Sequence, residues 1–358
     1  MGEFSWLEVL RTGAFRTSRS RTILLSERRE PSGDAFATMA ALSPSITQGK
    51  ASARPFNSML HTQEPQEQHQ HQQSDKSDER EAQRHRALEF AALNRRGGLL
   101  LANVWDLGSA RLFEQQGFSA LGTSSAAIAY SHGLGDAERL GRDAMMAQIA
   151  TLASGLRLPL NADIESGYGP SPEAVALSTA ATIRAGAVGV NLEDRRHGEA
   201  GQGQYTIAEQ CRRLEAARAA AERSGLPLWI NARIDSVLLA EGQDSDERLA
   251  LTLARGRAYL AAGADMVFVP GLLDLGQIRA LATQLGGPLN LMAMPGAPSA
   301  GELFEAGAQR VSLGLCPMLS VMGLLRDLGR EVLQTGRWQV MGERFYGFGE
   351  AEALFAAP

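Results

Sequence analysis

Short apolar runs alternate with longer amphipathic stretches between residues 99 and 313. The runs are brief and rich in Val, Ile and Leu, which is typical of strands that are buried on both faces. Several of the longer stretches end at a glycine, as helices do when a left-handed residue caps them. The eight apolar runs are Leu99–Val104, Ala120–Thr123, Leu158–Leu160, Val188–Val190, Leu228–Ile230, Met266–Val269, Leu289–Leu291 and Arg310–Leu313.

Eight strand and helix units of this length predict an α/β fold, namely a TIM-type (β/α)8 barrel over residues 87–358. A doubly wound open sheet is the alternative. An extra helical stretch, residues 318–334, follows the eighth run and is apolar on several faces, so it should pack on another element or another subunit. The clearest helices between the strands are Pro172–Ala185, Ile207–Ser224, Ser245–Ala262, Leu275–Leu285 and Ser299–Ala306.

Residues 1–86 have a different composition from the rest of the chain. They contain the polar tract Gln66–Gln73 and many Ser and Arg residues, with no sustained apolar period. Such a segment buries too little apolar surface to offset the entropy lost on ordering. We therefore predict a disordered, low-complexity tail over residues 1–86 and a catalytic domain over residues 87–358.

Composition also limits the class of function. The net charge is −5 and no basic stripe occurs, which argues against a nucleic-acid partner. No apolar run is long enough to cross a membrane, and the two cysteines fit a reducing compartment, so we expect a cytoplasmic protein without a membrane partner. Lysine occurs only at Lys50 and Lys76. A Schiff-base mechanism within the barrel is therefore excluded, because it needs a lysine amine.

Acidic side chains follow two neighbouring apolar runs at the point where each run stops. Asp163 and Glu165 follow the third run, and Glu193 follows the fourth. Because the carboxyl ends of parallel strands meet at one rim, the three carboxylates should lie close together. Hard oxygen ligands favour Mg²⁺, with Mn²⁺ as a second possibility. The alternative is that these acids only cap the helices that follow.

Arg233 ends the fifth run and could bind a carboxylate or phosphonate through two hydrogen bonds. A buried ion pair with Asp235 or Glu193 is the competing interpretation. The second run ends in the small residues Thr123, Ser124, Ser125 and Ala126. Their backbone amides could approach a developing enolate oxygen, although a simple tight turn would look similar.

At this point the chain resembles the isocitrate lyase and phosphoenolpyruvate mutase superfamily over about residues 88–314. The resemblance implies a Mg²⁺ enzyme on a modified barrel, a homodimer or homotetramer in which subunits exchange the eighth helix, and a small 2-oxo or 2-hydroxy acid substrate. The matching motifs, in chain order, are Asn103–Asp106, Thr123–Ser125, Gly133–Asp136, Asp163–Gly169, Asn191–Asp194 and Ala232–Asp235.

The resemblance also implies roles for individual residues. Asp163 and Glu165 match the metal-binding acid pair, with Glu165 in place of the more usual Asp, and Glu193 matches a third acid that reaches the metal through water. Arg233 matches the arginine that grips the substrate, and Asp136 matches an acid near the reacting atoms. Thr123, Ser124, Ser125 and Ala126 fall where relatives bind the substrate carboxylate and the enolate oxygen.

The loop Arg195–Tyr205 departs from the family pattern. Lyases of this family carry a catalytic cysteine there, and phosphonate enzymes carry Lys and Asn, but this loop has no Cys, Lys or Asn. His197 is the residue in the loop that could transfer a proton near neutral pH, and a solvated loop without a catalytic role is the alternative.

These observations predict a Mg²⁺-dependent lyase-type enzyme that cleaves or forms a C–C or P–C bond next to a carboxylate through a metal-bound enolate. Arg233, Asp136 and His197 are the expected catalytic residues. Activity like that of a phosphonopyruvate hydrolase or an oxaloacetate decarboxylase is one alternative. A catalytically silent barrel that binds a metabolite as an oligomer is another.

Overall fold

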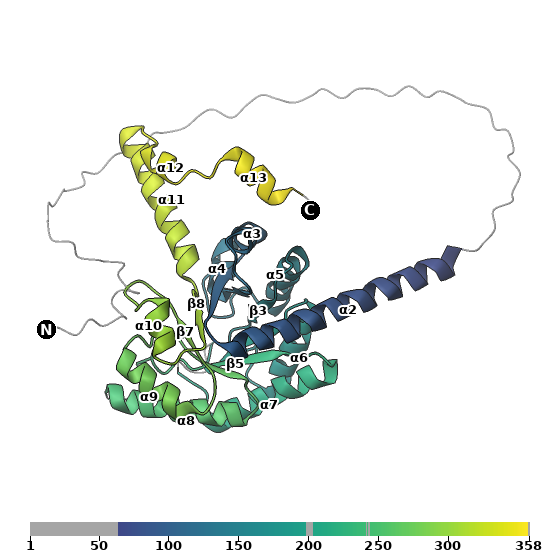
Figure 1. Ribbon diagram of the computed structural model, residues 1–358, viewed down its shortest axis with the longest axis vertical. Helices are drawn as coiled ribbons and strands as arrows, with labels where there is room; N and C mark the ends of the chain where they lie inside the picture. Colours follow the sequence, from purple (N-terminus) through teal and green to yellow (C-terminus); the bar gives the residue numbers. More distant parts are fainter. Residues whose placement is uncertain (1–63, 198–202, 241, 243, 357–358) are drawn as a thin grey trace, which may run out of the picture. The chain divides into compact units, whose positions relative to one another are not determined.

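Eight parallel strands close into a barrel in sequence order, with β1 paired to β8 (Figure 1). The computed structural model describes residues 64–197, 203–240, 242 and 244–356, with side chains from residue 77 onward. The closed barrel confirms the predicted TIM-type fold and excludes the open sheet. The strands are β1 (Leu99–Val104), β2 (Leu121–Thr123), β3 (Leu160–Asp163), β4 (Gly189–Glu193), β5 (Trp229–Arg233), β6 (Met266–Val269), β7 (Leu289–Met292) and β8 (Arg310–Ser312).

Helices cover the outside of the barrel, and all five that the sequence predicts are present within two residues of their predicted ends. Most begin at a polar N-cap, such as Thr206 before α7, whose hydroxyl accepts from the amide of Glu209 at 3.3 Å. The barrel helices are α3 (Leu107–Gln115), α4 (Ser125–Ser131), α5 (Arg142–Gly155), α6 (Pro172–Arg184), α7 (Ile207–Ser224), α8 (Ser245–Ala261), α9 (Leu275–Leu285) and α10 (Ala300–Glu305).

The N-terminal boundary differs from the prediction. Helix α2 runs from Glu64 to Arg96, so the described residues before position 87 are helical, whereas residues 1–63 lie outside the described part. Gln83 holds this helix to the barrel by donating to the carbonyls of Ile183 at 2.8 Å and Ala187 at 3.0 Å. Composition could not reveal this anchoring, because it depends on main-chain acceptors about 100 residues away.

The last part of α2 packs against the amino-terminal end of the barrel. Ala87, Phe90 and Ala91 are buried in the main hydrophobic core. A Cβ atom at Gly189 would lie 2.7 Å from the Phe90 ring, so only glycine at the start of β4 allows so close an approach. The core of the domain therefore includes α2, part of which precedes the predicted domain boundary at residue 87.

The strand register brings the charged strand ends together. Asp163 pairs with Asn191, and Glu193 pairs with Arg233. The amide of Asn191 accepts hydrogen bonds from Asn161 at 3.0 Å and Asn231 at 2.8 Å, so these three side chains face the barrel interior. Side chains two residues further along a strand point the same way. Asp163, Glu193 and Arg233 therefore face inward at the carboxyl-terminal rim.

The predicted extra helix is present as α11 (Cys316–Thr335), and it is followed by α12 (Gln339–Glu343) and α13 (Phe348–Phe355). In Figure 1 α11 leaves the barrel after β8 and carries α12 and α13 with it. The apolar side chains of α11 are largely exposed, Leu325 by 59%. Within the described residues, none of the helices combines the length and the apolar character needed to cross a membrane.

We expect Phe90→Ala to lower the free energy of unfolding by about 3–5 kcal/mol, because the ring is fully buried between α2 and the barrel. Urea denaturation followed by circular dichroism measures the change. Leu88→Ala is the matched control on the same helix, since Leu88 is 52% exposed. Equal losses in the two variants would contradict the packing of α2 against the barrel.

Candidate active site

Asp163 is held at the end of β3 by residues that follow β2. Its Oδ2 atom accepts from the Ser125 hydroxyl at 2.8 Å and from the Ser125 amide at 3.3 Å. The Asp163 amide donates to Thr123 Oγ1 at 2.8 Å. Burial raises the pKa of Asp163, and the charge of Arg233 opposes this effect. Thr123 and Ser125 thus orient an acid that is almost fully shielded from water.

The predicted substrate-binding segment is therefore partly occupied by protein contacts. Ser125 uses both its amide and its hydroxyl on Asp163. Ser124 caps α4 by accepting from the Ala127 amide at 3.3 Å. Ala126 is buried in the first turn of the helix. The structure brings all four small residues to the rim beside Asp163, and their contact with a substrate stays a prediction.

Glu165 lies beside Asp163 in the loop after β3. Its Oε2 atom accepts from the Glu138 amide at 2.5 Å, and its Oε1 atom accepts from the Tyr168 hydroxyl at 3.3 Å. Burial and then the charge of Asp136 raise the pKa of Glu165 to about 8, although the Glu138 amide opposes them. Asp136 itself is exposed, yet it is close enough to act on both Asp163 and Glu165.

Left-handed backbone is concentrated around this loop. Among the described residues, five positions other than glycine have positive φ, and four of them are at this site. Such conformations are strained for residues with a Cβ atom, and they persist where the surroundings fix them. The four residues are Ala137 (φ 77°), Glu138 (φ 60°), Glu165 (φ 51°) and Tyr168 (φ 58°).

Glu138 fixes the loop that follows β3 through two hydrogen bonds. Its Oε1 atom accepts from the Ser166 hydroxyl at 2.6 Å and from the Tyr168 amide at 2.8 Å. No sequence motif points to Glu138, because it lies outside the matched motifs and its role depends on contacts with residues about 30 positions away. Its position two residues after Asp136 was the one available signal.

Arg233 forms the buried ion pair that the competing interpretation described. Its Nε and Nη2 atoms donate to the two carboxylate oxygens of Asp235 at 2.6 and 3.0 Å, and its Nη1 atom lies 2.7 Å from Glu193 Oε2. Burial lowers the pKa of Arg233, but the charges of Asp235 and Glu193 outweigh burial and raise it. The guanidinium therefore stays charged and rigid between two acids.

His197 lies against the other oxygen of Glu193, with 2.5 Å between His197 Nε2 and Glu193 Oε1. Burial lowers the pKa of His197, but the hydrogen bond and charge of Glu193 outweigh burial and hold it above the ordinary value. In Glu193, by contrast, burial raises the pKa, and the charge of Arg233 opposes this effect. Both oxygens of Glu193 are thus engaged by protein groups. The following residues 198–202 lie outside the described part of the chain.

Asp194 joins β4 to neighbouring elements in a second buried network. Its Oδ1 atom accepts from the Asp235 amide at 3.0 Å and from Gln204 Nε2 at 2.8 Å, and its Oδ2 atom accepts from the Tyr259 hydroxyl at 2.8 Å. Burial, followed by the charge of Asp235, raises the pKa of Asp194 to about 6, and Arg255 opposes this. The network supports Asp235, which in turn holds Arg233.

Arg213 of α7 is a structural residue that sequence analysis missed. It donates to the carbonyls of Ser166, Gly169 at 2.8 Å and Pro170 at 2.6 Å, and its guanidinium lies 4.0 Å from the Tyr205 ring centre. These contacts tie the loop after β3 to α7. Main-chain carbonyls leave no signature in the sequence, so no pattern pointed to Arg213.

The three predicted metal ligands do not form a closed cluster. Within the described residues, no group of three or more His, Cys, Asp or Glu side chains is arranged to hold a metal ion. Glu193 faces Arg233 and His197, whereas Asp163 and Glu165 are neighbours joined through the Glu165 amide. The charges of Asp163 and Glu193 help to raise the pKa of Glu165. Asp163 and Glu165 alone therefore supply neighbouring hard oxygen donors of the kind that a divalent cation prefers.

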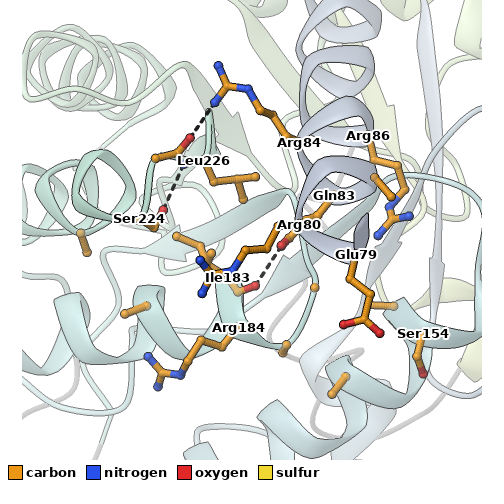
Figure 2. A pocket seen from close by; sticks show the side chains of 18 of the residues that line it. Glu79, Arg80, Gln83, Arg84, Arg86, Ser154, Ile183, Arg184, Ser224 and Leu226 are labelled. Atoms are coloured by element: carbon orange, nitrogen blue, oxygen red, sulfur yellow. Dashed lines mark hydrogen bonds between the residues drawn. The ribbon is translucent and has the colours of Figure 1, made fainter. Parts of the chain in front are cut away.

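A cavity larger than the hollow beside the acids lies elsewhere. It has a volume of about 1160 Å³ and lies between α2 and the ends of α5, α6 and α7 (Figure 2). Its lining includes Gly186 and Gly225, which precede β4 and β5, so it opens at the amino-terminal end of the barrel. A hollow of about 630 Å³ beside the acids includes Glu138 and Tyr168. Chemistry, rather than cavity size, therefore places the candidate active site at the carboxyl-terminal rim.

The profile of the family described as phosphoenolpyruvate phosphomutase matches residues 90–333. The chain belongs to this family. The match covers all eight strands and nearly all of α11. The family is part of the isocitrate lyase and phosphoenolpyruvate mutase superfamily of metal-dependent lyases and mutases, which confirms the predicted resemblance.

Individual relatives agree with this assignment. The crystal structure of a candidate phosphonomutase from Burkholderia cenocepacia J2315 is 40% identical, with a TM-score of 0.66 over 70% of this chain and 99% of that chain. Oxaloacetate decarboxylase from Paraburkholderia xenovorans LB400 is 32% identical over 66% of this chain and 80% of its own length. Phosphonopyruvate hydrolase in complex with oxalate and Mg²⁺ shares the fold, with 23% identity and a TM-score of 0.65 over 75% of this chain and 94% of that chain.

We expect Arg213→Met to lower the free energy of unfolding by about 2–4 kcal/mol, because three carbonyls lose a charged donor. Urea titration measures the loss. Arg212→Met is the matched control, since Arg212 is the exposed neighbour on the same helix and should stay within about 0.5 kcal/mol of the wild type. A neutral Arg213→Met would contradict the anchoring role.

Proposed function

We propose that the protein is a metal-dependent lyase-type enzyme acting on a small 2-oxo or 2-hydroxy acid. It would cleave or form a C–C or P–C bond next to the substrate carboxylate. The observation that carries this proposal is the inward-facing set of Asp163, Glu193 and Arg233 at one rim, with Glu165 beside Asp163. Membership of a superfamily of lyases and mutases supports the same reaction class.

Arg233 would orient the acidic group of the substrate. Three of its five N–H groups are used by Asp235 and Glu193, which leaves two for an anion. Because two acids fix the guanidinium, little side-chain entropy is lost when the substrate binds. A preorganised charge of this kind stabilises charge that develops in the transition state.

Proton transfer would fall to His197 or Asp136. His197 is held by Glu193 at the rim and its pKa lies above the ordinary value, so it would carry a proton near neutral pH. Asp136 is exposed but lies near Asp163 and Glu165. The Ala126 amide would approach the developing enolate oxygen, because the amides of Ser124 and Ser125 already donate to Val104 and Asp163. Thr123 keeps Asp163 in place.

Asp163, Glu165 and Glu193 would hold Mg²⁺, or Mn²⁺, with Glu193 acting through water. When bound, the cation supplies positive charge next to the substrate carboxylate. The crowded acids at the rim support this assignment, and the phosphonopyruvate hydrolase that shares the fold binds Mg²⁺ with oxalate.

Two relatives favour specific reactions within this class. The similarity to oxaloacetate decarboxylase supports decarboxylation. The similarity to phosphonopyruvate hydrolase from Variovorax sp. strain Pal2, which is 25% identical over 63% of this chain, supports hydrolysis of a P–C bond. The loop Arg195–Tyr205 has neither the cysteine of the lyases nor the Lys and Asn of the phosphonate enzymes, so it favours neither reaction and leaves room for a binding role. A silent barrel that only binds a metabolite is the remaining alternative.

The full-length protein should be incubated with Mg²⁺ and a panel of 2-oxo and 2-hydroxy diacids plus phosphonopyruvate. Release of a 2-oxo acid that Glu193→Ala abolishes would support the proposal and name the substrate class. Calorimetric binding of oxalate in the presence of Mg²⁺ tests the site independently of turnover. Oxalate binding without release from any compound would favour the silent barrel.

We expect Arg233→Ala to lower kcat/KM by about 100-fold or more on the substrate found in that panel, because one preorganised charged donor is lost. Steady-state kinetics measure the change, with folding checked by circular dichroism. Arg212→Met serves as a control that removes an arginine outside the site. A folded Arg233→Ala variant with wild-type turnover would contradict the assigned role.

We also propose that the protein is a cytoplasmic homodimer or homotetramer assembled through α11. The described cysteines, Cys211 and Cys316, are both free, as expected in a reducing compartment. Leu319, Met322 and Leu325 on α11 are 46%, 47% and 59% exposed. An apolar surface of this kind is typical of a subunit interface.

The double variant Met322→Asp with Leu325→Asp should be a monomer, because two charges would enter the proposed interface. Light scattering after size exclusion measures the mass. Gln334→Asp, an exposed polar position on the same helix, is the control and should keep the wild-type mass. A double variant that keeps the wild-type mass would contradict assembly through α11.

A further inference from the structure

Arg310 is a fully buried arginine at the opposite end of the barrel from the candidate active site. It is the first residue of β8, its exposed fraction is 0%, and it pairs with Leu99 of β1 and Asn290 of β7. Helix α2 lies next to it, with the Phe90 ring centre 5.9 Å from the guanidinium carbon. The side chain is therefore enclosed by the barrel and by α2.

One edge of this guanidinium has no partner within the described residues. Nη1 donates to Asn94 Oδ1 at 3.3 Å, whereas Nε and Nη2 form no hydrogen bond. In Arg233 the corresponding two atoms donate hydrogen bonds to the carboxylate of Asp235. Nε and Nη2 point in parallel from one side of the guanidinium, which is the geometry that binds an anion through two hydrogen bonds.

No acidic side chain offsets the charge of Arg310. Burial lowers the pKa of Arg310 to about 9, and burial alone accounts for this direction. Arg310 forms no salt bridge with any acid in the described part of the chain. A buried charge without a counter-charge is strongly unfavourable, so the folded protein gains stability from anything that neutralises it.

The barrel strands contain further buried polar atoms without a partner among the described residues. Asn290, the neighbour of Arg310 across the β7–β8 pairing, leaves both its amide nitrogen and its amide oxygen without a hydrogen bond. Trp229 Nε1 is also a buried donor without a partner. The buried oxygens of Asn161 and Asn231 in the middle of the barrel are unsatisfied as well. Buried polar groups in folded proteins are nearly always paired, so this interior should hold additional species.

We propose that the barrel interior binds a small inorganic anion of the size and charge of chloride on the Nε–Nη2 edge of Arg310. The amide nitrogen of Asn290 is the adjacent donor for the same anion. Water molecules would serve the unpartnered amide oxygens of Asn161 and Asn231, which cannot face an anion. The enclosure by Phe90 and Asn94 favours a monatomic ion over a larger organic acid. The site is structural and separate from the acids at the other rim.

Thermal unfolding at fixed ionic strength tests this proposal, with chloride replaced stepwise by gluconate, which is too large to enter. We expect the wild-type melting temperature to be higher in chloride by roughly 4 °C, because a ligand that binds only the folded state stabilises it. Arg310→Met keeps the volume but removes the charge, so its melting temperature should not depend on the anion beyond the change seen in the control. Arg279→Met, an exposed arginine on α9, is the control for general salt effects.

Crystals of the wild-type protein grown in bromide provide a test that needs no variant. An anomalous peak within hydrogen-bond distance of Arg310 Nε and Nη2 would support the proposal. Density for water alone at that position would overturn it. An equal dependence on chloride in the wild type and in Arg310→Met would overturn it too. A failure of this site would leave the proposed enzymatic function untouched, because the readouts are stability and anomalous density.

Discussion

Crowding of buried carboxylates at the carboxyl-terminal rim is the constraint on which the rest of this structure depends. Asp163, Glu193 and Asp235 are nearly or fully buried within a few residues of three neighbouring strand ends. Burial raises the pKa of Asp163 and of Glu193, and the charge of Arg233 opposes this effect in both. The Arg233 guanidinium therefore helps Asp163 and Glu193 to keep their negative charge. It also explains why removing Arg233 should disturb both substrate binding and the acids themselves.

Supporting contacts around the rim serve to fix the position of those charges. Glu138 and Arg213 both hold the loop after β3, and the strained backbone at Glu165 and Tyr168 persists because these contacts fix it. Asp194 supports Asp235 through the Asp235 amide. Each acid at the rim is thus oriented by a second group, which is the arrangement that preorganised sites need.

The parts that the sequence predicts correctly are those with a local signal. The strand runs are apolar and short, the helices carry caps such as Thr206, and the acids stand where the runs end. The missed parts depend on contacts between distant segments. Gln83 and Arg213 bind main-chain carbonyls, which every residue possesses. Composition therefore suggested disorder for the segment that contains Gln83, and no pattern pointed to a role for Arg213. Left-handed backbone at Glu165 also has no sequence signal, because glycine is the residue that usually marks it.

Arg233 and Arg310 face the barrel interior at opposite ends and show how charge is distributed along its axis. Arg233 lies among acids and is fully paired on its Nε–Nη2 edge, whereas Arg310 lies among amides with that edge free. A row of asparagines, Asn161, Asn191 and Asn231, lies between the two ends and carries no net charge. These asparagines place no counter-charge between Arg310 and the acidic rim. At the rim the carboxylates thus suit a cation and Arg233 suits an acidic substrate, whereas Arg310 at the other end has no acidic partner among the described residues.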